Sequence, residues 1–138
     1  MANKKVVFVS VPMAGKSDAL IERAIQLAKV QYCHINKVNV KEVTFIDGFH
    51  DVYQKFTDTE KKIISEKKHE SVNWLGMSIA MMGNVDEVVC GINWERARGC
   101  RIEVQVAEEY GIPVIKIDKE ISEKILEEMR EDKRKRSE

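Results

Sequence analysis

Four short apolar runs along the chain have the composition of strands that are buried on both faces. They are rich in β-branched and aromatic residues, and turn residues or proline bound them. They span residues 4–12, 37–47, 86–92 and 112–117. Runs of this kind are typical of the central strands of a parallel sheet.

The segments between these runs repeat their apolar positions at the spacing of an α-helix. The predicted helices cover residues 17–33, 57–70, 71–85, a segment that opens near Arg96 and ends at Gly111, and 118–133. In the first helix, Ser17 or Asp18 is the expected N-cap. Its expected buried face consists of Leu20, Ala24, Leu27 and Ala28.

Strands that alternate with helices predict an α/β protein with helices on both faces of a parallel sheet. A chain of 138 residues has the length of one domain. We therefore expect a single doubly wound domain, flavodoxin-like or Rossmann-like, over residues 1–138, with a four- or five-stranded parallel sheet. About residues 119–138 form the expected C-terminal helix, whose charged tail frays.

Composition excludes several classes of partner. The chain is 43% hydrophobic and 33% charged, and its 23 basic residues balance 23 acidic ones, so no net charge favours a nucleic acid or a membrane. Three cysteines without metal-ligand spacing predict reduced thiols. With no signal peptide or long apolar stretch predicted, the expected location is cytoplasmic. We expect no metal site and no cofactor.

In open α/β sheets, ligands bind beyond the carboxyl ends of the strands. Three stretches leave strands here: "SVPMAGKS", "IDGFHD" and "GINWERARG". Candidate site residues should therefore come from these stretches and from the first turns of the helices that follow them.

Glu103 occupies an unusual position in the helix that ends at Gly111. Counting roughly 100° per residue from Gly99, the residues Tyr110, Glu103 and Ala107 fall near 20°, 40° and 80°. Glu103 thus lies at the centre of the apolar stripe. A buried, unpaired carboxylate is costly, so it must be hydrogen-bonded, paired, or kept for chemistry.

The stretch "SVPMAGKS" resembles the end of a phosphate-binding P-loop. It departs from that motif at Ser10, where a glycine is expected, and at Pro12, which lacks an amide donor. The alternative is a tight strand-to-helix turn at Gly15. Even so, the helix N-terminus with Lys16 beside it is a candidate anion site.

Arg96, Arg98 and Arg101 crowd the opening of the helix that carries Glu103. Gly99 allows a ligand to approach the backbone closely. The alternative for each arginine is a surface ion pair with a glutamate, which contributes little.

Two stretches, "VFVSVPMAGK" and "VDEVVCGINWERARGCRIEVQVAEEYGIPVI", resemble the small nucleoside 2-deoxyribosyltransferase-like proteins of bacteria and phages. These typically read (S/G)-P-M-x-G after the first strand and W-x-x-S-x-G-x-x-x-E-x-x-x-A-x-x-x-G-[IL]-P near the end. The residues in register are Pro12, Met13, Gly15, Asp86, Trp94, Gly99, Glu103, Ala107, Gly111 and Pro113. The middle of the chain is not covered.

The resemblance implies that Glu103 is a nucleophile at the anomeric carbon of a deoxyribose or ribose. It further implies that Gly99 and its neighbours line the sugar or a 5′-phosphate, and that the loop of Pro12, Met13 and Gly15 closes over the base. The charges of Arg96 and Arg98 suit a phosphorylated substrate. Ser10, Lys16 and Trp94 complete the predicted substrate-binding set.

Two helper residues of the family pattern are replaced. Phe8 stands where active relatives usually have a tyrosine that holds the nucleophile, and Ser78 stands where they have an aspartate. The motif serine is Ala97. Asp47 and Asp51 leave the second strand and could replace the missing acid, as could His50.

Three functions therefore remain open. The first is an enzyme, hydrolase or transferase, that acts on the N-glycosidic bond of a nucleoside or nucleoside 5′-monophosphate. The second is a catalytically silent module that binds a nucleotide-like ligand, and the third is a small P-loop phosphotransferase. Related pockets often lie across a subunit boundary, so we expect a homodimer or a higher homo-oligomer.

Overall fold

The computed structural model describes residues 4–137, and strands and helices alternate along most of this chain. The strands are β1 (Lys5–Ser10), β2 (Val43–Asp47), β3 (Glu87–Cys90) and β4 (Val114–Lys116). The helices are α1 (Asp18–Asn36), α2 (Asp58–Ser65), α3 (Glu70–Met82), α4 (Arg98–Glu109) and α5 (Lys119–Ser137). Short 3₁₀ turns cover Val40–Glu42, Tyr53–Lys55 and Trp94–Arg96.

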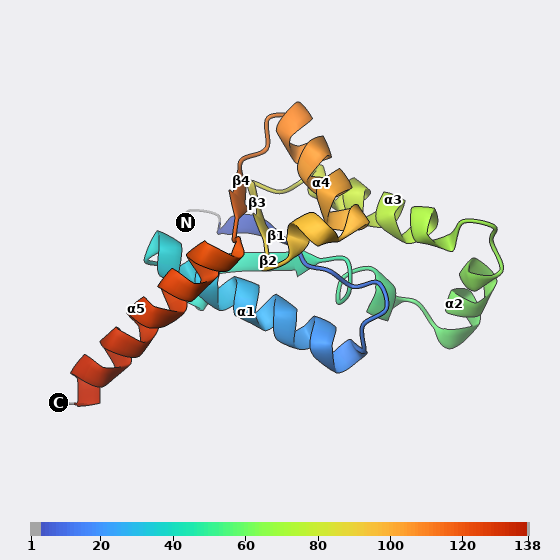
Figure 1. Ribbon diagram of the computed structural model, residues 1–138. Helices are drawn as coiled ribbons and strands as arrows, with labels where there is room; N and C mark the ends of the chain where they lie inside the picture. Colours follow the sequence, from blue (N-terminus) through green and yellow to red (C-terminus); the bar gives the residue numbers. More distant parts are fainter. Residues whose placement is uncertain (1–3, 138) are drawn as a thin grey trace.

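The strands form one parallel sheet in the order β2-β1-β3-β4 (Figure 1). This confirms the predicted α/β class and a doubly wound, Rossmann-like architecture. The order reverses between β1 and β3, because the chain passes from β1 outward to β2 and then returns to β3 on the other side of β1. Such a switch point is where open α/β sheets bind ligands.

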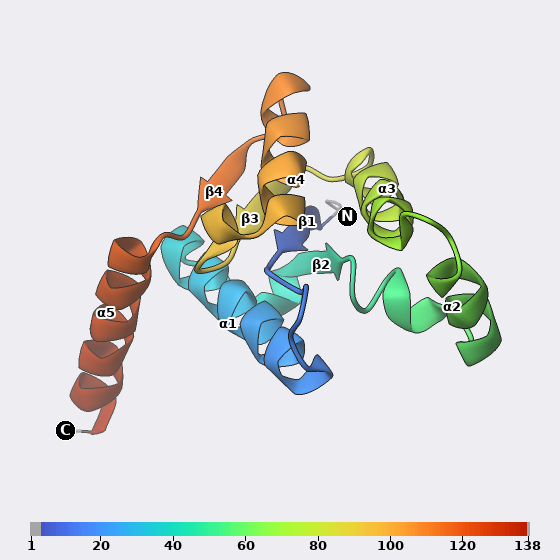
Figure 2. The ribbon, with the colours of Figure 1, turned by 45° about the vertical axis from the view of Figure 1, so that its right-hand side comes forward.

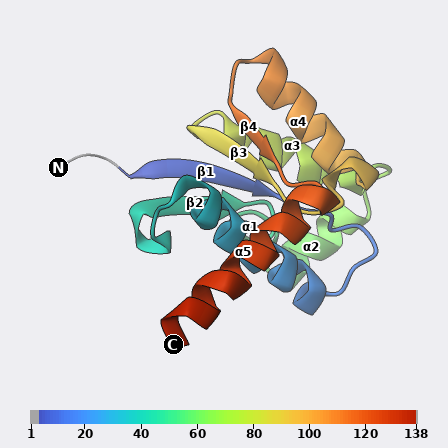
Figure 3. The ribbon, with the colours of Figure 1, turned by 60° about the vertical axis from the view of Figure 1, so that its left-hand side comes forward.

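Helices cover both faces of the sheet, as Figures 2 and 3 show. Val7 and Val9 point to the face that α1 covers, where Ile25 and Tyr32 pack against them. Phe8 points to the opposite face, which α3 and α4 cover. Because successive strand residues alternate between faces, Ser10 shares the face of Phe8 and points toward α4.

The buried face of α1 agrees with the prediction only in part. The buried residues are Ile21, Ile25, Ala28, Gln31 and Tyr32. Of the predicted residues, Ala28 is buried and Ala24 packs against the core, whereas Leu20 is 50% exposed. The larger Ile21, Ile25 and Tyr32 side chains fill the space above the sheet, and Leu20 is left on the flank of the helix.

Two predicted boundaries were also wrong. The second strand begins only at Val43, because Val40–Glu42 form a 3₁₀ turn capped by Asn39. The helix that begins after Thr57 ends at Ser65. Helix α4 ends just before Gly111, as predicted, but Tyr110 is its C-cap and is 81% exposed, so it does not belong to the apolar stripe.

Within residues 4–137, no helix is long and apolar enough to cross a membrane.

Candidate functional site

The ends of β1, β2 and β3 bring the site together at the carboxyl edge of the sheet. In the strand register, Ser10 is the partner of Cys90, and Val9 is the partner of Asp47. Helix α4 follows β3 and carries Glu103 over this edge. Residues that are far apart in the sequence therefore meet at the switch point of the sheet.

Glu103 is buried, with 6% of its surface exposed, as the helical pattern predicted. The Ser10 hydroxyl donates a hydrogen bond to Glu103 Oε1 at 2.7 Å. Among the ion pairs within residues 4–137, none includes Glu103. Burial raises the pKa of Glu103 to about 7, and the Ser10 hydrogen bond opposes that rise.

Two buried thiols lie beside this pair. Burial raises the pKa of the Cys100 thiol to about 12, and a hydrogen bond with Ser10 partly opposes the rise. Burial also raises the pKa of Cys90 well above its ordinary range. Both groups are therefore neutral near pH 7 and act as small apolar neighbours of the carboxyl group.

A cavity of about 10 Å³ lies next to Glu103, which is the space of about one water molecule. Phe8, Val9 and Ser10 of β1 line it, together with Met13 and Ile25. Asp47, Gly48 and Phe49 line it from the end of β2. Glu103 and Asp47 thus both contribute to the lining of one small cavity.

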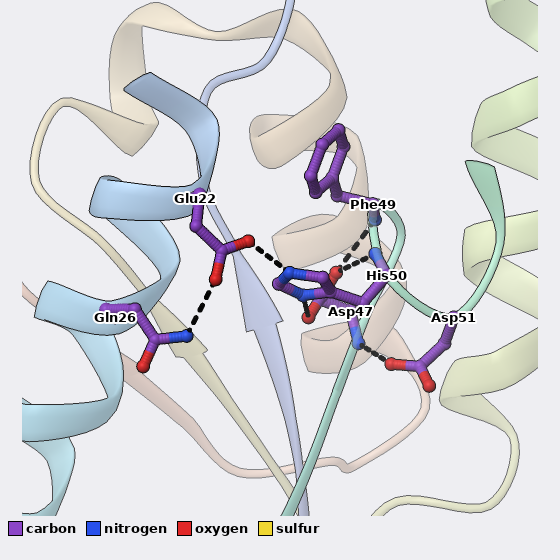
Figure 4. A network of polar contacts seen from close by, with 6 residues as sticks. All are labelled: Glu22, Gln26, Asp47, Phe49, His50 and Asp51. Carbon is purple, nitrogen blue, oxygen red and sulfur yellow. Dashed lines mark hydrogen bonds and ion pairs between the residues drawn. The ribbon is translucent and has the colours of Figure 1, made fainter. Parts of the chain in front are cut away.

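Asp47 belongs to a network that joins the end of β2 to α1 (Figure 4). Asp47 Oδ1 accepts hydrogen bonds from the backbone N–H groups of Phe49, at 2.8 Å, and His50, at 2.6 Å. Asp47 Oδ2 lies 2.8 Å from His50 Nδ1, and the other ring nitrogen of His50 contacts Glu22 on α1. Asp51 is outside the cavity lining and accepts the N–H of Asp47 at 2.9 Å.

The charges of this network favour a protonated histidine. Burial lowers the pKa of His50, but the hydrogen bonds and negative charges of Asp47 and Glu22 outweigh it, and the net pKa is raised. Slight burial raises the pKa of Glu22, and the hydrogen bonds from His50 and Gln26 lower it to a net value below its ordinary range.

The loop between β1 and α1 contains the predicted base-covering residues. Met13 reaches the cavity, whereas Gly15 and Lys16 are exposed. The backbone N–H of Lys16 donates to Met13 O at 3.1 Å, and Ser17 caps α1 by accepting the N–H of Leu20. The Lys16 amide is therefore used within the turn, which weakens the resemblance to a phosphate-binding loop.

The opening of α4 presents exposed arginines and backbone. Arg96 and Arg98 are exposed, and neither forms an ion pair with the described residues. Arg101 donates instead to the carbonyl of Glu95 at 3.0 Å. No side chain caps this helix, so its first amides remain available to an anion.

Trp94 and Gly99 occupy different environments at this end of the sheet. Trp94 packs against the core on the α3 and α4 face, and its indole N–H is buried without a partner among the described residues. A Cβ added at Gly99 would meet only Leu75 Cδ1, at 3.9 Å. Open space therefore remains beside the backbone of Gly99.

Two of the three positions that depart from the deoxyribosyltransferase-like pattern, Phe8 and Ser78, lie at or beside the cavity. Phe8 lines the cavity. Ser78 is buried beside Gly48, and a Cβ at Gly48 would lie 2.4 Å from Ser78 Oγ and 3.6 Å from Met13 Cε. The Ser10 hydroxyl, one strand repeat after Phe8 on the same face, contacts the carboxyl group that a tyrosine at position 8 was expected to hold.

Sequence reasoning missed two features of the site. It assigned Ser10 to the substrate, although alternation along β1 places Ser10 on the Glu103 side of the sheet. It also missed the contact between Glu22 and His50, which are 28 positions apart. No local pattern indicates that pair, because only the packing of α1 against the end of β2 creates it.

The fold and the site define an α/β protein with a buried carboxylate at the switch point of a parallel sheet. The chain belongs to the family described as "Domain of unknown function (DUF4406)", which matches residues 5–116. The match includes every strand and every residue of the site described above, and α5 follows it. No curated protein and no solved structure matches the chain.

Proposed function

We propose that this protein cleaves the N-glycosidic bond of a deoxynucleoside or nucleoside 5′-monophosphate, with Glu103 as the nucleophile. The observation that carries the proposal is the environment of Glu103. Its carboxyl group is buried, is hydrogen-bonded by Ser10 and has no cationic partner among residues 4–137, and it faces a cavity at the switch point. The resemblance to nucleoside 2-deoxyribosyltransferase-like proteins assigns the nucleophile to this same position.

The proposed reaction has two displacements at C1′ of the sugar. An oxygen of Glu103 bonds to C1′ while the C1′–N bond breaks, and its electron pair leaves on the base, which takes up a proton. Water or a second base then bonds to C1′, loses a proton, and returns the electron pair to the Glu103 carboxylate. Two displacements retain the configuration at C1′, as in retaining glycosidases.

Ser10 and Asp47 have separate roles in this mechanism. The Ser10 hydroxyl orients the Glu103 carboxylate and stabilises its charged form, since its hydrogen bond lowers the pKa of Glu103. Asp47 shares the cavity and is the carboxyl group that we propose for proton exchange with the base. His50 lies 2.8 Å from Asp47 Oδ2 and can pass protons between Asp47 and Glu22.

The opening of α4 favours a phosphorylated substrate. Arg96, Arg98 and the uncapped amides of this helix form a positive region close to Gly99. We propose that this region binds a 5′-phosphate, while Met13 covers the base. The proposal includes a homodimer or higher homo-oligomer, which light scattering tests directly.

A second function is favoured by the departures from the family pattern. Phe8 and Ser78 lack the hydroxyl and carboxyl groups expected there, so a catalytically silent module that binds the same ligand is the alternative. Chromatography of mixtures with deoxynucleosides and their 5′-monophosphates separates the two functions. Release of free base that Glu103→Gln abolishes supports the enzyme. Thermal stabilisation without release supports the binding module.

A further inference from the structure

We propose that the contact between Glu22 and His50 is a latch that keeps the Glu103 cavity closed, and that its release lets the β1–α1 segment move to admit a ligand. This inference rests on the proposed function in one respect only, because it takes the cavity as the place where the ligand binds. Figure 4 shows the latch, with Glu22 on α1 and His50 after β2.

The cavity is too small for a nucleoside as it stands. Its volume of about 10 Å³ accommodates about one water molecule. Pockets that bind small molecules of nucleoside size have volumes of roughly 300 Å³ or more. A ligand can reach Glu103 only if one wall of the cavity moves.

The latch connects two opposing walls. Ile25 of α1 lines one side, and Glu22 lies one helical turn before it. Phe49 lines the other side, and His50 follows it directly in the sequence. Any movement that separates α1 from the end of β2 at this point must therefore separate Glu22 from His50.

The wall formed by the end of β2 is firmly held. Phe49 is 3% exposed within the core, and its N–H bonds to Asp47. The backbone of Gly48 packs so closely against Ser78 that a Cβ would overlap it. This segment therefore remains in place when the cavity opens.

The opposite wall has one weakly held part, the β1–α1 loop. Ile25 is 0% exposed within the core and stays in place, whereas Met13 lines the cavity and is only half-buried. Residues 14–20, which follow Met13 and include the first turn of α1, are all exposed, and Glu22 lies two positions after them. Exposed segments with few buried contacts open at low free energy, so this loop is the part of the wall that moves.

The protonation state of His50 determines whether its ring can keep its contacts with both Asp47 and Glu22. A protonated imidazole has two N–H donors and satisfies both carboxylates, whereas a neutral imidazole has one. Asp47 is buried and holds His50 through backbone and side-chain bonds, while the Glu22 side chain is 45% exposed. The Glu22 contact is thus the one that is released. Other groups facing this network are Gln26 and Lys29 on α1 and Asp51 after β2.

The thiol of Cys100 is chosen as the reporter of opening, because it is buried and interacts with Ser10, which lines the cavity. The experiment measures its modification by a small maleimide in the intact chain, with peptide-resolved mass spectrometry. Cys33, which is half-buried on the distant part of α1, serves as the internal reference. The variants are Glu22→Gln, His50→Gln and the matched control Glu128→Gln, which removes a similar pair between His34 and Glu128 at 2.9 Å.

We expect Glu22→Gln and His50→Gln to raise the rate at Cys100 by about fivefold at about pH 6, with no change at Cys33. Glu128→Gln should leave the rate at Cys100 unchanged. The rate at Cys100 in the wild-type protein should approach that of the variants as the pH rises above the raised pKa of His50 and the imidazole loses its proton, after correction for thiolate formation. If one of the two latch variants, Glu22→Gln or His50→Gln, does not fold, the other is enough for the test.

Equal rates in the wild type and both latch variants overturn the proposal, as does equal acceleration by the Glu128 control. This outcome is independent of the reaction. Faster Cys100 modification without base release from any nucleoside retains the latch and removes the proposed function. Base release with unchanged Cys100 rates retains the function and removes the latch.

Discussion

The Ser10 hydroxyl donates a 2.7 Å hydrogen bond to the buried carboxyl group of Glu103. The first residue ends β1 and the second lies in α4, and they are 93 positions apart. Their contact fixes the orientation of the proposed nucleophile at the switch point of the sheet.

Replacing Ser10 with alanine should raise the pKa of Glu103 above about 7, because the hydrogen bond that stabilises its charged form is lost. The pKa should rise by roughly one to two units, since a hydrogen bond to a charged group contributes about 1.5–3 kcal/mol. NMR titration of the Glu103 side-chain carbon measures the pKa. Ser78→Ala, at another buried serine of the site, is the control and should leave the pKa of Glu103 unchanged.

Replacing Glu103 with glutamine should stabilise the protein at about pH 8. The pKa of Glu103 rises from about 4.5 to about 7 on folding, so the folded chain binds more protons than the unfolded chain between these values. The stability that Glu103 contributes is present below about pH 4.5 and is lost as the pH rises through about 7. The variant should gain up to about 3 kcal/mol in free energy of unfolding at about pH 8.

Urea denaturation at several pH values measures this difference. The gain should shrink toward about pH 5, where Glu103 in the folded protein is largely neutral. Glu109→Gln, at an exposed position of the same helix, is the control and should show no such trend. If Glu103→Gln raised the free energy of unfolding by the same amount at every pH, ionisation of the Glu103 carboxyl group would not be the cause of the difference.

Alanine at Gly48 and alanine at Gly99 should have opposite consequences. A Cβ at Gly48 would lie 2.4 Å from Ser78 Oγ, so Gly48→Ala should lower the free energy of unfolding by about 1–3 kcal/mol. The double variant Gly48→Ala with Ser78→Ala should regain part of this stability, because the clashing hydroxyl is removed. At Gly99 the nearest atom is 3.9 Å away, and alanine favours the helix by about 1 kcal/mol. Gly99→Ala should therefore remain folded and lose base release, because the methyl group occupies the proposed ligand space. Thermal unfolding and the base-release assay distinguish the two effects.

Neutralising Arg96 or Arg98 should weaken binding of a nucleoside 5′-monophosphate by about tenfold, and binding of the unphosphorylated nucleoside much less. Isothermal titration with both ligands gives this ratio. Arg101→Gln is the matched control, since Arg101 is already engaged by the Glu95 carbonyl. An equal loss for both ligands would contradict a phosphate site at the opening of α4.

The architecture could be predicted from the sequence because its signals are local and periodic. The apolar run at residues 4–12 predicted a strand, which is confirmed as Lys5–Ser10. The helical spacing of α4 predicted the burial of Glu103, which is also confirmed. The buried face of α1 was predicted only in part. Ala28 is buried as expected, but Ile21 is buried in place of Leu20, since the two residues are similarly apolar and only packing selects one.

The polar contacts of the site could be predicted only in part. The rule that sites lie at the ends of parallel strands brought Ser10, Asp47 and the opening of α4 into the candidate set. The pairing of Ser10 with Glu103, and of Glu22 with His50, depends on rotamers and on helix positions that no periodic pattern encodes.

The most direct test is a search for a covalent sugar on Glu103. The protein is mixed with the deoxynucleoside or 5′-monophosphate from which it releases base, quenched with acid within a single turnover, digested and analysed by mass spectrometry. The account predicts that the peptide containing Glu103 gains the mass of the dehydrated deoxyribose, or of its 5′-phosphate, and that Ser10→Ala reduces its yield. Rapid base release with no adduct, and with undiminished release by Glu103→Gln, would contradict it.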